Sequence, residues 1–187
     1  VMVVPADSPY NNVLEFVEAA KEQNMTFSHS GVGSSIHMSG ELFKTLTGTN
    51  MTAVPFAGSG AALPALLGGD VDVSFENMPT VFSHIQSGDL KALAVTSAER
   101  SEYLPDVPTL EEIGEYNLDQ FTTTAWFGLI AHESFPEEAM TVMQEALQEV
   151  MKREEFTSFV DQLGAEPGAV AGDEFKAFIA EEVARWD

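Results

Sequence analysis

Cysteine is absent from this 187-residue sequence, and basic residues are scarce. The absence of cysteine excludes a disulfide framework, a thiolate zinc site and a thiol nucleophile. The sequence has 8 Lys and Arg residues against 30 Asp and Glu residues, so its formal net charge is −22 at pH 7. Nucleic acids and anionic membrane surfaces attract clustered Lys and Arg side chains, and this charge balance therefore argues against both as partners.

Long hydrophobic runs are also missing. No stretch approaches the roughly 18 consecutive apolar residues that indicate a transmembrane helix, and the first residues lack the basic-then-apolar pattern of a secretory signal. The sequence begins inside a β-rich run, Val1–Val4, and we therefore expect further sequence to precede it. Its hydrophobic content of 44% is ordinary for a globular protein and indicates a buried core rather than disorder.

Motifs of common enzyme classes are absent as well. Neither the zincin motif H-E-x-x-H nor the P-loop motif G-x-x-x-x-G-K-[ST] occurs. Gly31-Val32-Gly33 begins like a dinucleotide-binding fingerprint, but Ile36 stands where the third glycine is required. Gly58-Ser59-Gly60 resembles a nucleophile elbow, but alanines replace the two outer glycines of that motif. We therefore expect no catalytic residues, no cofactor and, from four scattered histidines, no metal site.

Short β-rich runs alternate with helical patterns as far as Thr96. This alternation predicts an α/β fold with a mainly parallel sheet and helices on both of its faces. Helices are expected from about Asn12, from about Ser35 and over Pro79–Gln86. The expected strands are Val1–Val4, Thr26–Ser30, Met51–Pro55, Val71–Phe75 and Leu90–Thr96.

The pattern changes after Ala98. Phe121–Ile130 is a long β-rich run without turn residues and predicts a crossover strand, which three amphipathic helical patterns follow. Residues 121–187 thus hold the expected crossover strand and the C-terminal helices. Because the apolar faces of these helices need a partner surface, we expect self-association through them or partial mobility. These faces include Phe175, Phe178, Ile179 and Trp186.

Three expected strands end in a loop of small or polar residues that starts a helix. The loops are Ser30–Ser35, Pro55–Ser59 and, with a weaker pattern, Glu76–Asn77. Unpaired N–H groups at a helix start favour an anion, and the carboxyl ends of parallel strands meet at one edge of a sheet. The pattern predicts a carboxylate site built from neutral donors, although each loop alone could serve only as a turn and a cap.

An ordered set of short motifs resembles the Bordetella-uptake-gene type of solute receptor. These receptors are the extracytoplasmic substrate-binding proteins of tripartite tricarboxylate transporters. The motifs cover nearly the whole sequence, and they are Ser30-Gly31-x-Gly33-Ser34-Ser35-x-His37, Val54-Pro55-Phe56-x-Gly58-Ser59, Leu66-Leu67-Gly68-Gly69-Asp70, Leu90-Lys91-Ala92-Leu93-Ala94, Leu104-Pro105-Asp106-Val107-Pro108, Trp126-Phe127-Gly128-Leu129 and Leu163-Gly164-Ala165-Glu166-Pro167.

The resemblance implies a two-domain, type II periplasmic-binding-protein fold that closes on a small carboxylate or related metabolite. It also implies a periplasmic or other extracytoplasmic location and membrane permease subunits as partners. Residues 1–120 then correspond to domain two, residues 121–187 return to domain one, and the first third of the family sequence is missing. Ala57 stands where the family often has a lysine, which removes a local cation.

The resemblance also implies a set of ligand-binding residues, among which we expect Ser34 and Ser35 to donate to the ligand directly or through water. The full set is Ser30, Gly31, Gly33, Ser34, Ser35, His37, Pro55, Phe56, Gly58, Ser59, Glu76 and Asn77. Two alternatives stay open. The first is an effector-sensing domain of a transcription regulator, which shares this fold family, and the second is a hydrolase that uses Ser59.

Overall fold

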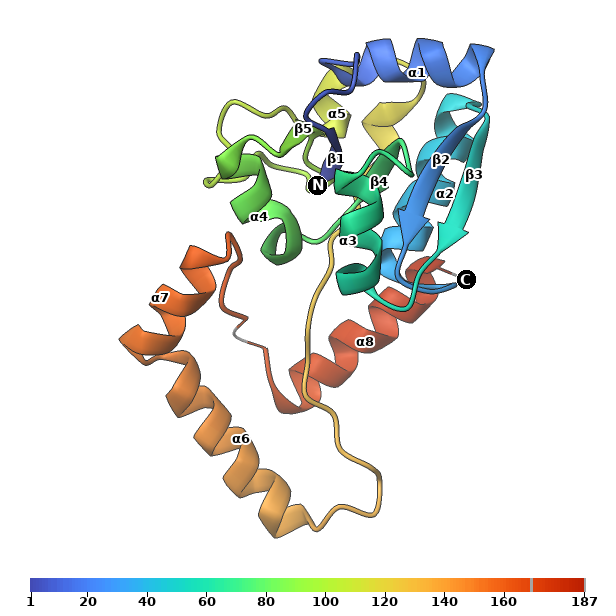
Figure 1. The fold of residues 1–187 in the computed structure, drawn as a ribbon. Coiled ribbons are helices and arrows are strands. Elements are labelled where there is room, and N and C mark those ends of the chain that lie inside the picture. The colour runs from blue at the N-terminus through green and yellow to red at the C-terminus, as the bar shows by residue number, and fades with distance from the viewer. Residues whose placement is uncertain (169, 187) are drawn as a thin grey trace. The chain divides into compact units, whose positions relative to one another are not determined.

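A computed structural model describes residues 1–168 and 170–186, and it divides the chain into two compact units, Val1–Trp126 and Phe127–Asp187 (Figure 1). The first unit contains a five-stranded sheet with strand order β3-β2-β4-β1-β5. The strands are β1 (Met2–Pro5), β2 (Met25–His29), β3 (Met51–Pro55), β4 (Val73–Phe75) and β5 (Leu90–Ala94).

The sheet is mainly parallel, as predicted, with one exception. β2 pairs in parallel with β3 and with β4, whereas β1 pairs antiparallel with β4 and with β5. Four strands therefore share one direction, and β1 runs against them between β4 and β5. All four residues of β1 are buried, which explains its unbroken apolar sequence. Such a run indicates burial on both faces but carries no signal for strand direction.

Helices cover both faces of the sheet, which confirms the predicted α/β layers. On one face, side chains of α1 and α2 pack with α5 and the short helix η1, and on the other face α3 and α4 pack together. β1 serves both layers, because Met2 and Val4 join the first core while Val3 joins the second. The helices of this unit are α1 (Val13–Glu22), α2 (Ser35–Thr47), α3 (Ser59–Leu67), α4 (Met78–Ser87), α5 (Leu110–Ile113) and η1 (Leu118–Gln120).

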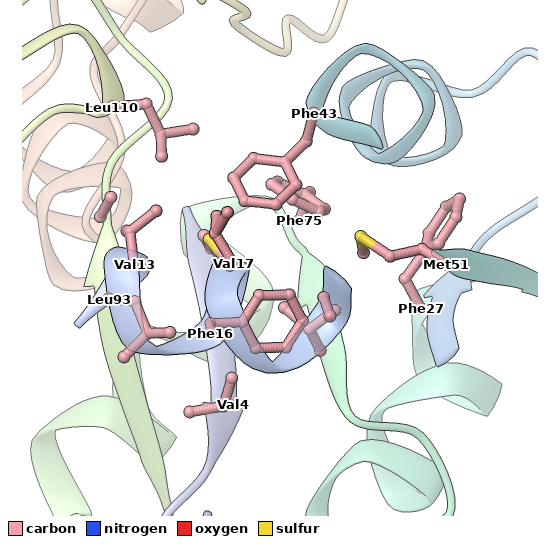
Figure 2. Close-up of a cluster of buried hydrophobic side chains, with 14 of the residues drawn as sticks. Val4, Val13, Phe16, Val17, Phe27, Phe43, Met51, Phe75, Leu93 and Leu110 are labelled. Atoms are coloured by element: carbon pink, nitrogen blue, oxygen red, sulfur yellow. The ribbon is translucent and has the colours of Figure 1, made fainter. Parts of the chain in front are cut away.

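The larger core is centred on Phe43 of α2. Its ring centroid lies 5.3 Å from that of Phe75, 6.3 Å from Phe16 and 6.4 Å from Phe121. Figure 2 shows Phe43 beside Phe16 of α1 and Phe75 of β4. The cluster therefore holds α1, α2 and the sheet together through fully buried aromatic surface.

α2 lies directly against β2 because residue 40 is glycine. A Cβ atom at Gly40 would lie 2.3 Å from Cε2 of Phe27, closer than any real contact of this kind. The aromatic ring of Phe27 thus occupies the space that a side chain on α2 would need. This contact sets the separation between helix and strand at the point where the loop of residues 30–34 connects them.

The predicted crossover strand over Phe121–Ile130 is wrong. The structure has an extended segment there, with no ladder of strand pairing in the described residues. Its first part is bonded to the segment that follows β5, because the N–H group of Thr123 donates to the carbonyl oxygen of Thr96 at 2.8 Å. Further on, the side chains of Phe127 and Ile130 are exposed. The β-rich composition predicts extended backbone, which the structure has, but a strand also needs a neighbour to pair with.

The second unit contains three helices, α6 (Glu137–Met151), α7 (Glu154–Gln162) and α8 (Gly172–Trp186). None of them contributes a buried residue, although each has an amphipathic sequence. Val142 on α6, Phe159 on α7 and Val183 on α8 are more than half exposed. No helix in the described part of the chain is both long and apolar enough to cross a bilayer.

The position of Phe43 generates a stability prediction. We expect Phe43→Ala to lower the free energy of unfolding by about 3–5 kcal/mol, because it removes a fully buried ring from the larger core. Denaturant unfolding followed by circular dichroism measures the loss. Val32→Ala serves as the control, because this side chain is 87% exposed and should have almost no effect. Equal effects of the two substitutions would contradict the described core.

Candidate functional site

All of the predicted site residues lie at the carboxyl ends of three neighbouring strands. β2 lies between β3 and β4 and is parallel to both, so the three strands end at the same edge of the sheet (Figure 1). The loop after β2 leads into α2, the loop after β3 into α3, and the residues after β4 into α4. The N–H group of Phe56 donates to the carbonyl oxygen of His29 at 2.9 Å and joins two of the loops. The structure thus brings three helix N-termini to one edge.

The loop after β2 uses several of its own N–H groups internally. The N–H of Gly31 donates to Nδ1 of His29 at 3.2 Å, and the N–H of Gly33 donates to Nδ1 of His37 at 3.3 Å. The N–H of Ser34 donates to the carbonyl oxygen of Gly31 at 3.2 Å. The sequence predicted free backbone donors along this whole loop, but these three bonds give the loop its shape instead.

Ser34 is the N-cap of α2. Its Oγ accepts from the N–H of His37 at 3.2 Å and donates to the carbonyl oxygen of Gly31 at 2.8 Å. Both functions of the hydroxyl are therefore occupied by the backbone, which gives Ser34 a structural role. The hydroxyls of Ser30 and Ser35, in contrast, make no hydrogen bond with the described residues, so they can donate to a ligand.

His29 is a site residue that the sequence reasoning missed. It is the last residue of β2, only 2% exposed, and its ring centroid lies 4.4 Å from that of His37. Because Nδ1 of each ring accepts a backbone N–H, each ring carries its proton on Nε2. The two imidazoles act as a scaffold for the glycine loop. The alternation of β2 placed His29 on the same face as Phe27, and this was the available signal.

α3 begins without a side-chain cap. Gly58 is its N-cap and has φ of 93°, a left-handed backbone that favours glycine. No described side chain makes a capping hydrogen bond there. Ala61 and Ala62 both donate to the carbonyl oxygen of Gly58, whereas the N–H groups of Ser59 and Gly60 have no acceptor in the described residues. These two donors lie at the positive end of a nine-residue helix.

Glu76 is a buried carboxyl beside this helix start. Its side chain is 1% exposed, and Oε1 has no hydrogen-bond partner in the described part of the chain. Oε2 accepts from the N–H of Asn77 at 3.3 Å. Burial raises the pKa of Glu76 above its ordinary value, while the hydroxyl of Ser59 and the N–H of Asn77 act in the opposite direction. The Oγ of Ser28 on β2 is likewise buried and has no hydrogen-bond partner among the residues that the structure describes.

The third helix start, that of α4, resembles that of α3. Asn77 is its N-cap, but its side chain makes no capping bond and is partly exposed. Its amide can therefore donate to a ligand. Neither Lys nor Arg occurs in the three loops, so attraction of an anion depends on helix ends and neutral donors. The described residues contain no group of three or more His, Asp or Glu side chains that could hold a metal ion.

Comparison with protein families gives one match along the full sequence. The family described as "Tripartite tricarboxylate transporter family receptor" matches residues 1–187. Protein BugT of Bordetella pertussis is 34% identical over 167 residues, which are 89% of this chain and 50% of that protein. A UPF0065 protein encoded between tcbD and tcbE in Pseudomonas sp. strain P51 is 28% identical and covers 100% of this chain and 55% of its own length. The chain thus spans about half the length of these curated relatives.

Solved structures show the same similarity. Rpa4515 of R. palustris, solved with adipate, is 30% identical with a TM-score of 0.91, over 100% of this chain and 62% of that one. MatC of Rhodopseudomonas palustris, solved with bound malate, is 27% identical with a TM-score of 0.91, over 100% of this chain and 64% of that one. The periplasmic binding protein BugD is 28% identical with a TM-score of 0.88, over 99% of this chain and 62% of that one.

The burial of Glu76 predicts how stability changes with pH. Because its pKa is raised in the folded state, the folded protein keeps a proton that the unfolded chain releases above about pH 4.5. The contribution of Glu76 to stability is therefore complete below that pH and is lost as the pH rises through the folded pKa.

We expect Glu76→Gln to remove this loss, so that the variant gains stability relative to the wild type as the pH rises. Urea unfolding of both proteins at acidic, neutral and alkaline pH measures the difference. Glu99→Gln is the control, because Glu99 is exposed and its substitution removes the same charge without changing a buried group. A difference between wild type and Glu76→Gln that does not change with pH would contradict the prediction.

Proposed function

The chain belongs to the tripartite tricarboxylate transporter receptor family, and on this basis we propose that it binds a small carboxylate for delivery to the permease subunits of such a transporter. The family is one of solute receptors, which agrees with the absence of common enzyme motifs in the sequence. We further propose an extracytoplasmic location, supported by the similarity to the periplasmic binding protein BugD.

The observation that carries this proposal is the uncapped start of α3 beside that of α4. Within the described residues, the N–H groups of Ser59 and Gly60 have no acceptor, and the side-chain amide of Asn77 makes no capping bond. Helix starts of this kind bind carboxylates through backbone donors and the positive end of the helix dipole. The adipate and malate complexes of two structural neighbours support a carboxylate as the class of ligand.

The hydroxyls of Ser30 and Ser35 complete the proposed set of donors from the neighbouring strand end. We place Ser34 outside this set, because its hydroxyl caps α2 and shapes the loop. Bridging water can extend the reach of these neutral groups, since a water-mediated bond is nearly as favourable as a direct one. In this arrangement the ligand charge is stabilised by several polar groups and not by one ion pair.

We also propose that the two units correspond to different domains of the receptor. The first unit carries the helix starts and corresponds to domain two of the receptor. The second unit, α6–α8, corresponds to the part of the sequence that returns to domain one. Its amphipathic helices without a single buried residue support this assignment, because such faces need a partner surface. The longer chains of the structural neighbours agree with it.

Substitution of the two serines at the start of α2 tests the binding proposal. We expect Ser35→Ala to weaken adipate or malate binding by about 1–2 kcal/mol, because a buried ligand oxygen loses a hydrogen bond. Ser34→Ala is the matched control and should instead lower the stability of the protein by about 1 kcal/mol through loss of the N-cap. Isothermal titration calorimetry and thermal unfolding separate the two effects. Unchanged affinity in Ser35→Ala and Asn77→Ala alike would place the ligand elsewhere.

The second unit gives a separate prediction about association. We expect the 187-residue chain to self-associate in solution through the exposed apolar faces of α6–α8. Phe159→Ser should reduce the average mass measured by light scattering, because Phe159 is 60% exposed on α7. Val32→Ser is the control, since Val32 is more exposed but lies in the first unit. A strict monomer at all concentrations would refute this prediction.

A further inference from the structure

The start of α3 and the buried carboxyl of Glu76 lie next to each other, and a negative charge on one affects the other. We propose that binding of an anionic carboxylate at the start of α3 is coupled to protonation of Glu76, so that the site takes up a proton together with its ligand. This inference rests on the proposed function, because it concerns the same site. The coupling makes the ligand affinity depend on pH through the titration of Glu76 and not through the titration of the ligand.

The contacts around Glu76 offer little stabilisation to an ionised carboxylate. An ionised carboxylate accepts several hydrogen bonds, but in the described residues Oε1 has no partner and Oε2 receives one bond of 3.3 Å from Asn77. The side chain is 1% exposed, so water does not replace the missing donors at the surface. Ser59, the first residue of α3, is the other polar group that acts on this carboxyl.

Among the described residues, no charged side chain lies against Glu76 to compensate its charge. From the β1 side, the backbone nitrogen of Val1 donates to the backbone oxygen of Glu76 at 2.8 Å. β1 itself, Met2–Pro5, contains no titratable side chain.

In the described part of the chain, α3, α4 and β2 place no charged side chain against Glu76. α3 contains no titratable residue, and the histidine of α4, His84, lies near the end of its helix and contacts Asp89. On β2, His29 faces the opposite layer with Phe27, and Ser28 is on the side of Glu76.

The coupling follows from a shared field. The start of α3 offers the equivalent of about half a positive charge, which can stabilise one nearby anion. If Glu76 is ionised, the positive helix end already stabilises its charge, and the carboxylate of Glu76 repels the ligand. If Glu76 is protonated, the helix end stabilises the charge of the ligand instead. By reciprocity, a bound anion favours the protonated form of Glu76 by the same factor by which protonation favours binding. Above the pKa of Glu76, affinity should then fall by up to about tenfold per pH unit, as expected for one linked proton.

Calorimetric titration with adipate tests the proposal directly. Titrations of the wild-type chain in two buffers of different ionisation enthalpy, repeated from mildly acidic to alkaline pH, give the number of protons taken up. We expect proton uptake and falling affinity with rising pH in the wild type. Glu76→Gln, a neutral carboxamide of the same shape, should bind without this uptake and with a flatter pH profile. Because adipate itself titrates in mild acid, the readout is the difference between the two proteins.

Two further measurements keep the test decisive. Glu99→Gln removes an exposed charge and should retain the wild-type proton uptake. If Glu76→Gln does not fold, carbon-13 NMR titration of the Glu76 carboxyl in the wild type, with and without adipate, should show a pKa that rises on binding. Adipate binding without proton uptake, or uptake that persists in Glu76→Gln, overturns the coupling and leaves the proposed function intact. Failure of both adipate and malate to bind at any pH overturns the proposed function, and the coupling with it.

Discussion

The parallel pairing of β2 with β3 and β4 is the constraint on which the rest of the site depends. Because the three strands run in one direction, their carboxyl ends meet at one edge, and each continues into the start of a helix. A reversed strand among these three would send its loop to the opposite edge. The only strand that does run in reverse, among those described, is β1, which carries none of the site residues. The antiparallel strand is thus placed where it cannot separate the loops.

Much of this architecture could be predicted from the sequence. The alternation of β-rich and helical patterns gave the order of elements, and the small residues after three strands gave the edge where the loops gather. β1 shows the limit of this reasoning. The apolar run Val1–Val4 predicts a strand that is buried on both faces, but it does not predict whether the strand is parallel or antiparallel to its neighbours. Phe121–Ile130 shows another limit. Local composition describes its extended backbone, but strand formation depends on a neighbour that local composition does not specify.

The candidate site was predictable in outline but not in its hydrogen bonds. Glycine and serine residues indicated a loop that presents backbone donors, yet two of those donors turn inward to His29 and His37. Nothing in the spacing of the two histidines along the sequence shows that their rings pack together, since they lie on different elements. The same holds for Glu76, which is buried where β4 pairs with β1, a strand far from it in the sequence. Pairwise contacts between distant segments thus decide which polar groups stay free.

The contact between Gly40 and the ring of Phe27 has a consequence for how the first loop behaves. The loop of residues 30–34 connects β2 to α2, and the contact between Gly40 and Phe27 fixes the distance between this strand and this helix. With both ends fixed and its interior bonded to two imidazoles, the loop has little slack to rearrange around a ligand. Its donors are preorganised, so that little conformational entropy is lost when a ligand is captured. Gly40 therefore contributes to the preorganisation of the loop, although it is not part of that loop.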